Sequence, residues 1–328
     1  MGKKIVTLGE IMLRLSPPDN ERFLDYRGFE AFYGGCEANV AVSLVMFGHD
    51  AEFITKLPGN DLGQTAINSL RTFGVKTENI LRGGDRIGIY FTETGASIRS
   101  SKVIYDRKGS SFSDASYDEF DFDELFKGKD IYQVSGISPA LGEKTKDLIF
   151  KSVKKAHEMG LTVCYDYNFR SSLWTREESE KFLEDLMPYV DILIGYIPSW
   201  DGEVVDHDKF KNSFKEYYDK YNLKLITSTL RESVSASDNL IEAVMYDGKD
   251  YIISDTYDFR IVNRIGGGDA FTAGLLSEYI YGSDSRKMLE FAVASCVWKH
   301  TIHGDYNIAS REEIEEIASG DKSGKVKR

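Results

Sequence analysis

Strand-like and helical segments alternate through the middle of this 328-residue chain. Buried strands are expected at residues 130–135, 162–167, 191–195 and 223–228, and helices at about 141–159, 176–187 and 207–221. Parallel strands cannot be joined by a tight turn and need a crossover, which is usually a helix. The alternation therefore predicts an α/β fold whose mostly parallel central sheet is covered by helices on both faces.

The same scheme extends towards both ends of the chain. Glycine commonly ends a helix, and Asp-Gly commonly forms a hairpin turn. Towards the N-terminus we expect a strand at 5–9, a helix at 36–47 ended by Gly48, a strand at 51–57 and a helix at 61–73 capped by Asp61. Towards the C-terminus we expect a hairpin at 240–246 and 249–254 that extends the main sheet, and helices at 285–302 and 310–318.

Residues 86–106 break the alternation. Two alternating segments, 87–93 and 101–106, lie on either side of Gly95 with no helix between them, which predicts a β-hairpin. The mixed segment before residue 34 is available to pair with it. We therefore expect a small antiparallel sheet that projects as a lid over the carboxyl ends of the parallel strands, where α/β proteins bind ligands. The expected division is a main domain of residues 1–10, 34–86 and 111–320, a β lid of residues 11–33 and 87–110, and a frayed tail of residues 321–328.

The charge of the chain excludes some classes of partner. A net charge of −12 and a pI of about 5.1 argue against nucleic acid, whose phosphates require clustered cations. They do not argue against a small anionic substrate, which needs only one or two local arginines. No apolar run reaches membrane-spanning length, and we expect a cytoplasmic protein. Three distant cysteines, Cys36, Cys164 and Cys296, are expected to be buried thiols rather than a disulfide framework or a metal site.

A triple glycine near the end of the chain is the strongest chemical signal. Gly266, Gly267 and Gly268 are followed at once by Asp269 and by a run of small and apolar residues typical of a helix. Glycines let the backbone approach a ligand closely, and a helix start adds free amides and a positive dipole end. This arrangement predicts an anion cradle with Asp269 placed to take a proton from a hydroxyl that attacks a phosphate.

Residues 263–269 resemble the second signature of the PfkB (ribokinase-like) carbohydrate kinase family, whose usual form is D-T-x-G-A-G-D. The first signature is visible as G-G-x-x-x-N-x-A at 34–41 and continues through Gly48 to residues 56–63. The resemblance implies a three-layer α/β/α fold and ATP-dependent transfer of a phosphoryl group to a sugar hydroxyl. It also implies Asp269 as the base, the amides of Gly266–Gly268 as the anion hole, and Mg²⁺ as a cofactor, with the K⁺ dependence of some relatives left open.

Two arginines point to the class of sugar. Arg107 follows the hairpin and Arg170 follows the strand at 162–167, and each offers a planar fork that binds a carboxylate through two hydrogen bonds. With Tyr90 and Tyr105, this set is similar to that of 2-keto-3-deoxygluconate kinases, and the terminal hydroxyl of such a sugar acid is the expected acceptor. The resemblance also implies that Gly34, Gly35, Asn39 and Asp305 bind substrate and that Asn168, Ser228, Thr229, Arg231 and Ser233 bind the nucleotide.

Three departures from the family pattern lie on the nucleotide side. Asn263 replaces an acidic residue, and residues 227–233 replace a G-x-x-G turn. The N-x-x-E motif, which helps to place Mg²⁺ through water in relatives, is missing at 194–199. Glu203 lies close by as a substitute carboxylate, but the sequence does not identify the metal ligands.

Other interpretations stay open at this point. The chain is alternatively a kinase for a neutral ketose, similar to fructokinase or ribokinase, or for another keto-deoxy acid. Outside that class, it is a sugar-acid-binding regulator with a weakened nucleotide site. His300 and His303 are expected to be structural, because no third metal ligand accompanies them. Exposed edges of the projecting sheet favour a homodimer or a higher homo-oligomer, with a dimer formed through that sheet.

Overall fold

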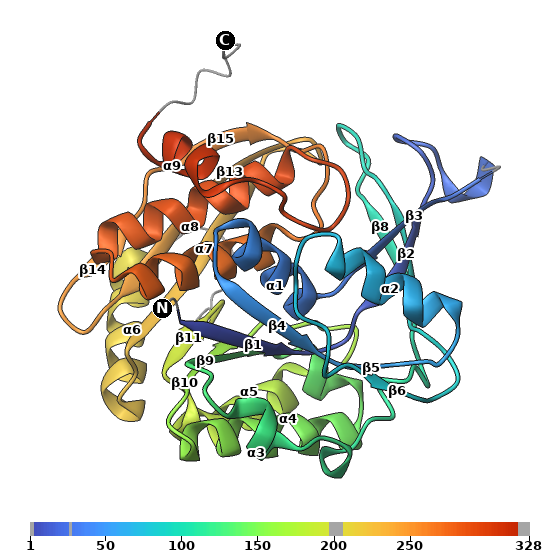
Figure 1. Ribbon diagram of the computed structural model, residues 1–328. Coiled ribbons are helices and arrows are strands. Elements are labelled where there is room, and N and C mark those ends of the chain that lie inside the picture. The colour runs from blue at the N-terminus through green and yellow to red at the C-terminus, as the bar shows by residue number, and fades with distance from the viewer. Residues whose placement is uncertain (1–2, 26–27, 197–205, 321–328) are drawn as a thin grey trace.

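A nine-stranded sheet forms the centre of the molecule in the computed structural model, which describes residues 3–25, 28–196 and 206–320 (Figure 1). The strands run in the order β14-β13-β12-β11-β10-β9-β1-β4, and β15 also pairs with β13. They are β1 (Lys4–Leu8), β4 (Asp50–Ile54), β9 (Ile131–Ser135), β10 (Thr162–Asp166), β11 (Ile192–Ile194), β12 (Leu225–Ser233), β13 (Asp238–Tyr246), β14 (Tyr251–Ile253) and β15 (Tyr257–Arg260). The six strands from β4 to β12 in this order pair in parallel, and β13, β14 and β15 add antiparallel pairs at one end.

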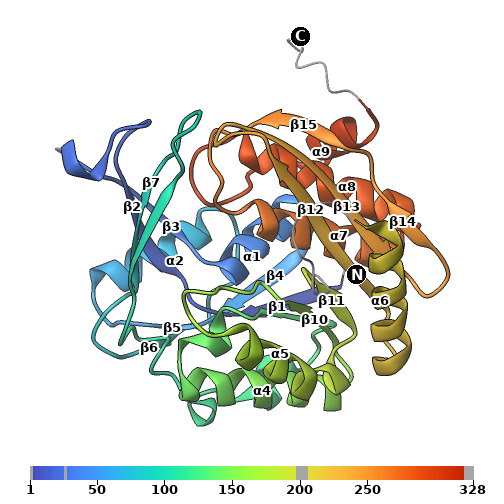
Figure 2. The same ribbon diagram turned by 180° about the vertical axis from the view of Figure 1, so that it is seen from behind.

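Helices cover both faces of this sheet (Figures 1 and 2). One layer contains α1 (Cys36–Met46), α7 (Gly267–Tyr281), α8 (Ser285–His300) and α9 (Arg311–Ala318), and the other contains α3 (Phe122–Phe126), α4 (Glu143–Glu158), α5 (Arg176–Leu186) and α6 (His207–Tyr221). Alternate residues of a strand point to opposite faces, so Ile5 of β1 joins the core of the first layer while Val6 and Leu8 join that of the second. The expected three-layer α/β/α fold is confirmed.

A second sheet projects from one side of the molecule as the expected lid (Figures 1 and 2). Its four strands lie in the order β3-β2-β7-β8. The outer pairs are antiparallel, but β2 and β7 run parallel, so the sheet is mixed rather than wholly antiparallel. The physical reason is that two antiparallel pairs, β2 with β3 and β7 with β8, come from distant parts of the chain and join side by side through β2 and β7. The strands are β2 (Met12–Ser16), β3 (Glu30–Gly34), β7 (Ile89–Glu93) and β8 (Lys102–Asp106).

The tip of the lid touches the main sheet. The amide of Ala236 donates to the carbonyl oxygen of Ser97 at 2.8 Å, and the amide of Ser97 donates to Oγ of Ser237 at 3.0 Å. Ser97 lies between β7 and β8, and its partners Ala236 and Ser237 lie in the turn between β12 and β13. The lid therefore bridges the carboxyl ends of the parallel strands.

Two local expectations are corrected. The strand expected at 51–57 divides at Thr55, because β4 pairs with β1 whereas β5 (Lys56–Leu57) pairs with β6 (Leu81–Arg82). The cap of α2 (Asp61–Arg71) is Asn60 rather than Asp61, since Asn60 is extended and its side chain accepts from the amide of Gly63 at 3.1 Å. Short 3-10 helices lie at Phe23–Asp25, Tyr117–Glu119, Ser138–Leu141 and Met187–Tyr189. Among the described helices, none has the length and apolar character needed to cross a membrane.

Candidate active site

A cavity of about 400 Å³ lies at the carboxyl ends of the parallel strands and under the lid. All of the predicted site residues except Ser228 and Ser233 line it. They come from the segment after β10, from β12, from the lid, from the starts of two helices and from the segment after α8, so residues from most of the chain meet at one place. The predicted residues that line the cavity are Gly34, Gly35, Asn39, Tyr90, Tyr105, Arg107, Asn168, Arg170, Thr229, Arg231, Gly266, Gly267, Gly268, Asp269 and Asp305.

Two helices, α1 and α7, begin at this cavity. Their N-cap residues are Gly35 and Gly266, and neither helix has a side-chain cap. The first amides of a helix have no intrahelical acceptor, and together with the dipole they attract negative charge. The expected anion cradle of the triple glycine thus has a structural basis at the start of α7.

Steric limits explain why glycine occupies these positions. Gly266 has a φ of +86°, and a Cβ there would lie 2.2 Å from the carbonyl oxygen of Asp305. A Cβ on Gly267 would lie 2.1 Å from Cε1 of His300, and one on Gly34 would lie 2.1 Å from Oδ2 of Asp305. Gly268 differs, because a Cβ there would meet no atom within 4 Å. Gly266 and Gly267 are therefore required by the fold, whereas Gly268 faces open space.

Asp269 lies in the first turn of α7 and is 9% exposed. Nδ2 of Asn39 donates a hydrogen bond of 2.6 Å to its Oδ2 and fixes the carboxylate. Burial raises the pKa of Asp269, although hydrogen bonds from Cys36 and Asn39 oppose the shift. A buried, oriented carboxylate with a raised pKa is a stronger base than an exposed one, which suits it to proton removal from a hydroxyl.

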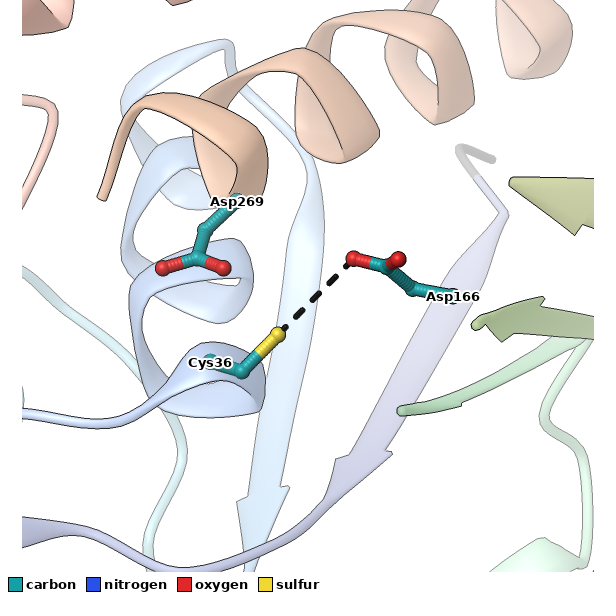
Figure 3. A group of neighbouring side chains, drawn as sticks. All are labelled: Cys36, Asp166 and Asp269. Atoms are coloured by element: carbon teal, nitrogen blue, oxygen red, sulfur yellow. Dashed lines mark hydrogen bonds between the residues drawn. The ribbon is translucent and has the colours of Figure 1, made fainter. Parts of the chain in front are cut away.

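Cys36 and Asp166 lie beside Asp269 (Figure 3). Their ligand atoms are all within 4.8 Å of one another, and Sγ of Cys36 lies 4.0 Å from Oδ2 of Asp166. Burial, followed by the charge of Asp269, raises the pKa of Asp166 to about 7. Burial also raises the pKa of the Cys36 thiol well above its usual value, so the sulfur stays protonated. Two carboxylates suit a hard cation such as Mg²⁺ that also binds substrate phosphates, but a thiol does not.

Tyr90 and Asp305, both expected to bind substrate, are bonded to each other. The hydroxyl of Tyr90 donates to Oδ2 of Asp305, and Nη1 of Arg14 lies 2.8 Å from Oδ1. The side chains of Arg14 and Asp305 are 1% and 0% exposed. Asp305 therefore supports the wall that joins the lid to the triple glycine, and its carboxylate is already paired within the protein.

Arg107 is likewise paired within the protein. Its Nε donates to Oε2 of Glu10 at 2.8 Å, its Nη2 contacts the same oxygen, and its guanidinium lies 5.5 Å from the centre of the Tyr105 ring. Ser110 also donates to Glu10. The fork expected to bind a substrate carboxylate is thus occupied by Glu10, although the side chain lines the cavity.

Arg170 has no such partner. Among the described residues, no carboxylate lies within ion-pair distance of its guanidinium, but its charge lowers the pKa of both Asp166 and Asp269. Asn168, two residues earlier, has a φ of +35° and donates from Nδ2 to Sγ of Cys36 at 3.4 Å. Non-glycine residues in this region are uncommon and occur at functional sites. The segment after β10 therefore presents a free positive charge beside the acidic group.

The nucleotide-side residues on β12 divide into two that line the cavity and two that do not. Thr229 and Arg231 point into the cavity, whereas Ser228 is fully buried and its hydroxyl donates to the carbonyl oxygen of Tyr196. Ser233 lies beyond the cavity, and its hydroxyl contacts Oδ1 of Asn239 at 3.2 Å. Direct nucleotide contacts by the side chains of Ser228 and Ser233 are therefore not supported. Of the departures noted in the sequence, Glu203 and residues 197–199 lie outside the described residues.

Several groups at the site were not expected from the sequence. Glu10 and Arg14 are buried partners of Arg107 and Asp305, and no local pattern marks pairs so distant in the chain. Glu37 is 1% exposed, accepts from the amide and hydroxyl of Ser135, and has its pKa raised by burial to about 7. Lys299 is fully buried behind Gly266, where its Cε lies 3.2 Å from the position of a Cβ on that glycine.

Comparisons with known proteins agree on one family. A family described as "pfkB family carbohydrate kinase" matches residues 2–310. The crystal structure of 2-dehydro-3-deoxygluconokinase from Thermotoga maritima superposes with a TM-score of 0.94 at 44% identity, covering 98% of this chain and 99% of that one. The 2-dehydro-3-deoxygalactonokinase of Haloferax volcanii is 31% identical over 99% of both chains. The 2-dehydro-3-deoxygluconokinase of Thermoproteus tenax is 27% identical over 95% of this chain and 93% of its own.

Proposed function

This chain belongs to the pfkB family of carbohydrate kinases, and we propose that it transfers the terminal phosphoryl group of ATP to the terminal hydroxyl of 2-keto-3-deoxygluconate, giving the 6-phosphate. The observation that carries the proposal is the position of Asp269. Its carboxylate is buried, held by Asn39, and placed at the start of a helix whose first residues are glycines. A base and an anion cradle at one point are what phosphoryl transfer to a hydroxyl requires.

The proposed step assigns each group a role. Asp269 takes the proton from the sugar hydroxyl, whose oxygen forms a bond to the γ-phosphorus of ATP. The bond between that phosphorus and the β–γ bridging oxygen breaks, and ADP leaves with the electron pair. The amides of Gly266, Gly267 and Gly268 stabilise the negative charge on the transferring group. Asn39 acts as a positioning residue, because its amide fixes the carboxylate through a hydrogen bond of 2.6 Å.

Arg170 supports an acidic sugar as the acceptor. It lines the cavity beside Asp166 and Asp269 without a carboxylate partner among the described residues, so a bound carboxylate would complete its pairing. Tyr105 and Gly35 line the same region and are proposed substrate contacts, together with Gly34, Tyr90 and Asp305 in its wall. The relatives' names give further support, although the gluconate and galactonate forms differ in configuration at one carbon, and we propose the gluconate form.

The pairing of Arg107 bears on the alternative of a neutral ketose as the acceptor. Because Glu10 occupies the fork of Arg107, the acceptor carboxylate meets one free arginine rather than the two expected from the sequence. A kinase for a neutral ketose would need neither arginine. Arg107 can bind the substrate carboxylate only if its ion pair with Glu10 breaks. We therefore propose that Arg170 supplies the main contact to that carboxylate.

We propose that Mg²⁺ arrives bound to the phosphates of ATP. Asp166 and Asp269 would supply nearby oxygen ligands, directly or through water, and the metal would supply charge neutralisation at the phosphates. Asn168 and Thr229 line the cavity and are proposed to contact the nucleotide. No role for K⁺ is proposed.

We propose a homodimer formed through the lid. The strand β8 is an edge of the lid sheet, and all five of its residues are exposed. Val103 and Ile104 are 42% and 54% exposed, so apolar side chains are accessible on that edge strand. Exposed apolar edge strands commonly pair with another copy of the chain.

A substrate panel tests the function. ADP release is coupled to a spectrophotometric signal with 2-keto-3-deoxygluconate, 2-keto-3-deoxygalactonate, fructose and ribose, each at varied Mg²⁺. The expected result is the highest kcat/KM for 2-keto-3-deoxygluconate, with a large loss of that preference in Arg170→Ala. Faster turnover of fructose or ribose would reject the acidic acceptor, and higher kcat/KM for the galactonate form would reassign the stereochemistry.

A further inference from the structure

Two arginines line the cavity beside the triple-glycine loop. Arg231 lies near the carboxyl end of β12, and Arg264 lies two residues before Gly266. Both line the cavity together with the three glycines. Arg264 has no role assigned by the sequence signature, and Arg231 was expected to contact the nucleotide without a stated partner atom.

A neutral histidine holds Arg231. Nη2 of Arg231 lies 2.9 Å from Nε2 of His300, which is fully buried. Nδ1 of His300 lies 2.6 Å from the carbonyl oxygen of Cys296, and because a carbonyl can only accept, Nδ1 carries the proton and Nε2 accepts from the arginine. Burial, followed by the charge of Arg231, lowers the pKa of His300 to about 3. His300 therefore orients the guanidinium without neutralising its charge.

Backbone carbonyl groups hold Arg264. Its Nη2 donates to the carbonyl oxygens of Ser235 and Ala236, each at 3.2 Å. The same turn receives the tip of the lid through Ser97. Carbonyl oxygens carry only partial charge, so Arg264 is oriented and remains cationic. Burial, followed by the charge of Arg231, lowers the pKa of Arg264.

The charge of this pair is not balanced within the protein. Among the described residues, no carboxylate lies within ion-pair distance of either guanidinium, whereas Arg107, which lines the same cavity, is paired with Glu10. Two like charges that line one cavity and are held by neutral groups repel each other, and an anion bound beside them relieves the repulsion. The loop that carries Arg264 also carries the amide cradle, which places the expected anion next to both.

We propose that Arg231 and Arg264 form a phosphate clamp that binds the β- and γ-phosphates of ATP beside Gly266–Gly268. The inference rests on the proposed kinase function and extends it to residues that hold the nucleotide. Guanidinium forks match phosphate oxygens and stabilise the negative charge that grows on the leaving β-phosphate as the P–O bond breaks. At a site where Asn263 replaces an acidic residue, the clamp supplies positive charge directly from the protein.

The substrate carboxylate is the competing anion for this pair. The position favours phosphate, because Arg264 lies in the same loop as Gly266, Gly267 and Gly268, whose amides form the anion cradle. The two anions predict opposite effects on the two substrates. A clamp for phosphate changes ATP binding, and a clamp for carboxylate changes the KM of the sugar acid.

Nucleotide binding without sugar tests the clamp. Calorimetric titrations with ATP, ADP and AMP are compared for wild type, Arg231→Ala, Arg264→Ala and Arg264→Lys. Arg260→Ala is the matched control, because Arg260 is exposed on β15 and does not line the cavity. Each alanine variant is expected to bind ATP about 10- to 100-fold more weakly. The loss of ADP affinity should be smaller, and the affinity for AMP and the KM of the sugar acid should not change. Arg264→Lys, which keeps the charge but loses the fork, should fall between.

Three results would overturn the clamp: wild-type ATP affinity in both alanine variants, equal weakening of AMP and ATP, or a rise confined to the sugar-acid KM. Thermal unfolding checks that each variant is folded, and Arg264→Lys serves if an alanine variant is not. The titrations do not depend on which sugar is the acceptor. A wild-type protein that binds ATP more tightly than AMP but phosphorylates no sugar acid would therefore reject the proposed function and leave the clamp intact.

Discussion

At the scale of single residues, the site contains a carboxyl group whose ionisation opposes folding. The pKa of Asp166 rises from 3.8 to about 7, chiefly because the group is buried and then because Asp269 is near. A folded-state pKa above the unfolded value means that the folded protein binds the extra proton between about pH 4 and 7. The stability contribution of Asp166 is therefore fully present below pH 4 and is lost as the pH rises towards 7.

Replacing Asp166 by asparagine should remove this cost. We expect Asp166→Asn to raise the free energy of unfolding at pH 8 by about 1–3 kcal/mol and to have a smaller effect at pH 5, where the native carboxyl group is protonated. Chemical denaturation at both pH values measures the difference, with the exposed Asp185→Asn as a control. A variant that is less stable than wild type at pH 8 would show that the carboxylate is stabilised by its surroundings.

Lys299 should set an alkaline limit on nucleotide binding. Burial lowers its pKa to about 8, although the charge of Asp305 opposes the shift, and the side chain lies against Gly266. Lys299 is charged below that pH, so the field that favours an anion at the glycine loop is lost as the pH rises through about 8. We expect ATP affinity to fall over pH 7–9 and Lys299→Met to bind ATP about tenfold more weakly at pH 7, with a flatter pH profile. Titration at several pH values checks both, and an unchanged slope in the variant would reject the assignment.

Residue chemistry was predictable where it lies in a continuous motif. Residues 263–269 and 34–41 predicted the positions of Asp269, the glycines and Asn39 at the cavity. The sequence did not predict the ion pair between Glu10 and Arg107 or the ion pair between Arg14 and Asp305. Such pairs form only when the lid and the main sheet come together, and one sequence carries no periodicity that links them.

At the scale of elements, the start of α7 offers a contrast between two glycines. Gly266→Ala should destabilise the protein by about 1–3 kcal/mol, because the position has a left-handed φ and a methyl group would meet the carbonyl oxygen of Asp305. Gly268→Ala should unfold at the wild-type temperature, since its Cβ meets no protein atom. Its methyl group would instead enter the space assigned to phosphate.

Activity separates the two glycine variants. For Gly268→Ala we expect a loss of kcat/KM for ATP of about 10-fold or more, because the methyl group blocks close approach to the amides. Thermal unfolding and steady-state kinetics with ATP are measured for the same preparations. Full activity in Gly268→Ala would mean that the phosphate does not approach the loop at this residue.

Elements were predictable from the alternation of segments, but their edges and partners were not. Asn60 caps α2 because its extended backbone places the side chain at the amide of Gly63, and adjacent Asn60 and Asp61 are both good caps by residue type. The parallel pairing of β2 with β7 joins segments separated by several elements, so hairpin signals could not predict its direction.

At the scale of the whole molecule, the lid edge predicts the oligomeric state. We expect light scattering to give twice the chain mass of 37.1 kDa. Ile104→Glu should shift the protein to the monomer, because Ile104 is 54% exposed on β8 and a charge there opposes burial against a second copy. The same substitution at the exposed Ile308 is the control. A wild-type monomer at micromolar concentration would reject a dimer formed through the lid.

The central claim is that Asp269 removes the proton from a sugar-acid hydroxyl during transfer of phosphate from ATP. The direct measurement is ADP release with and without 2-keto-3-deoxygluconate, for wild type and for Asp269→Asn, with binding of the sugar acid followed by calorimetry. We predict sugar-dependent ADP release by wild type and a fall in kcat of about 10²–10⁴-fold in the variant, with sugar binding retained. Sugar-dependent ADP release at the full wild-type rate in Asp269→Asn would contradict it.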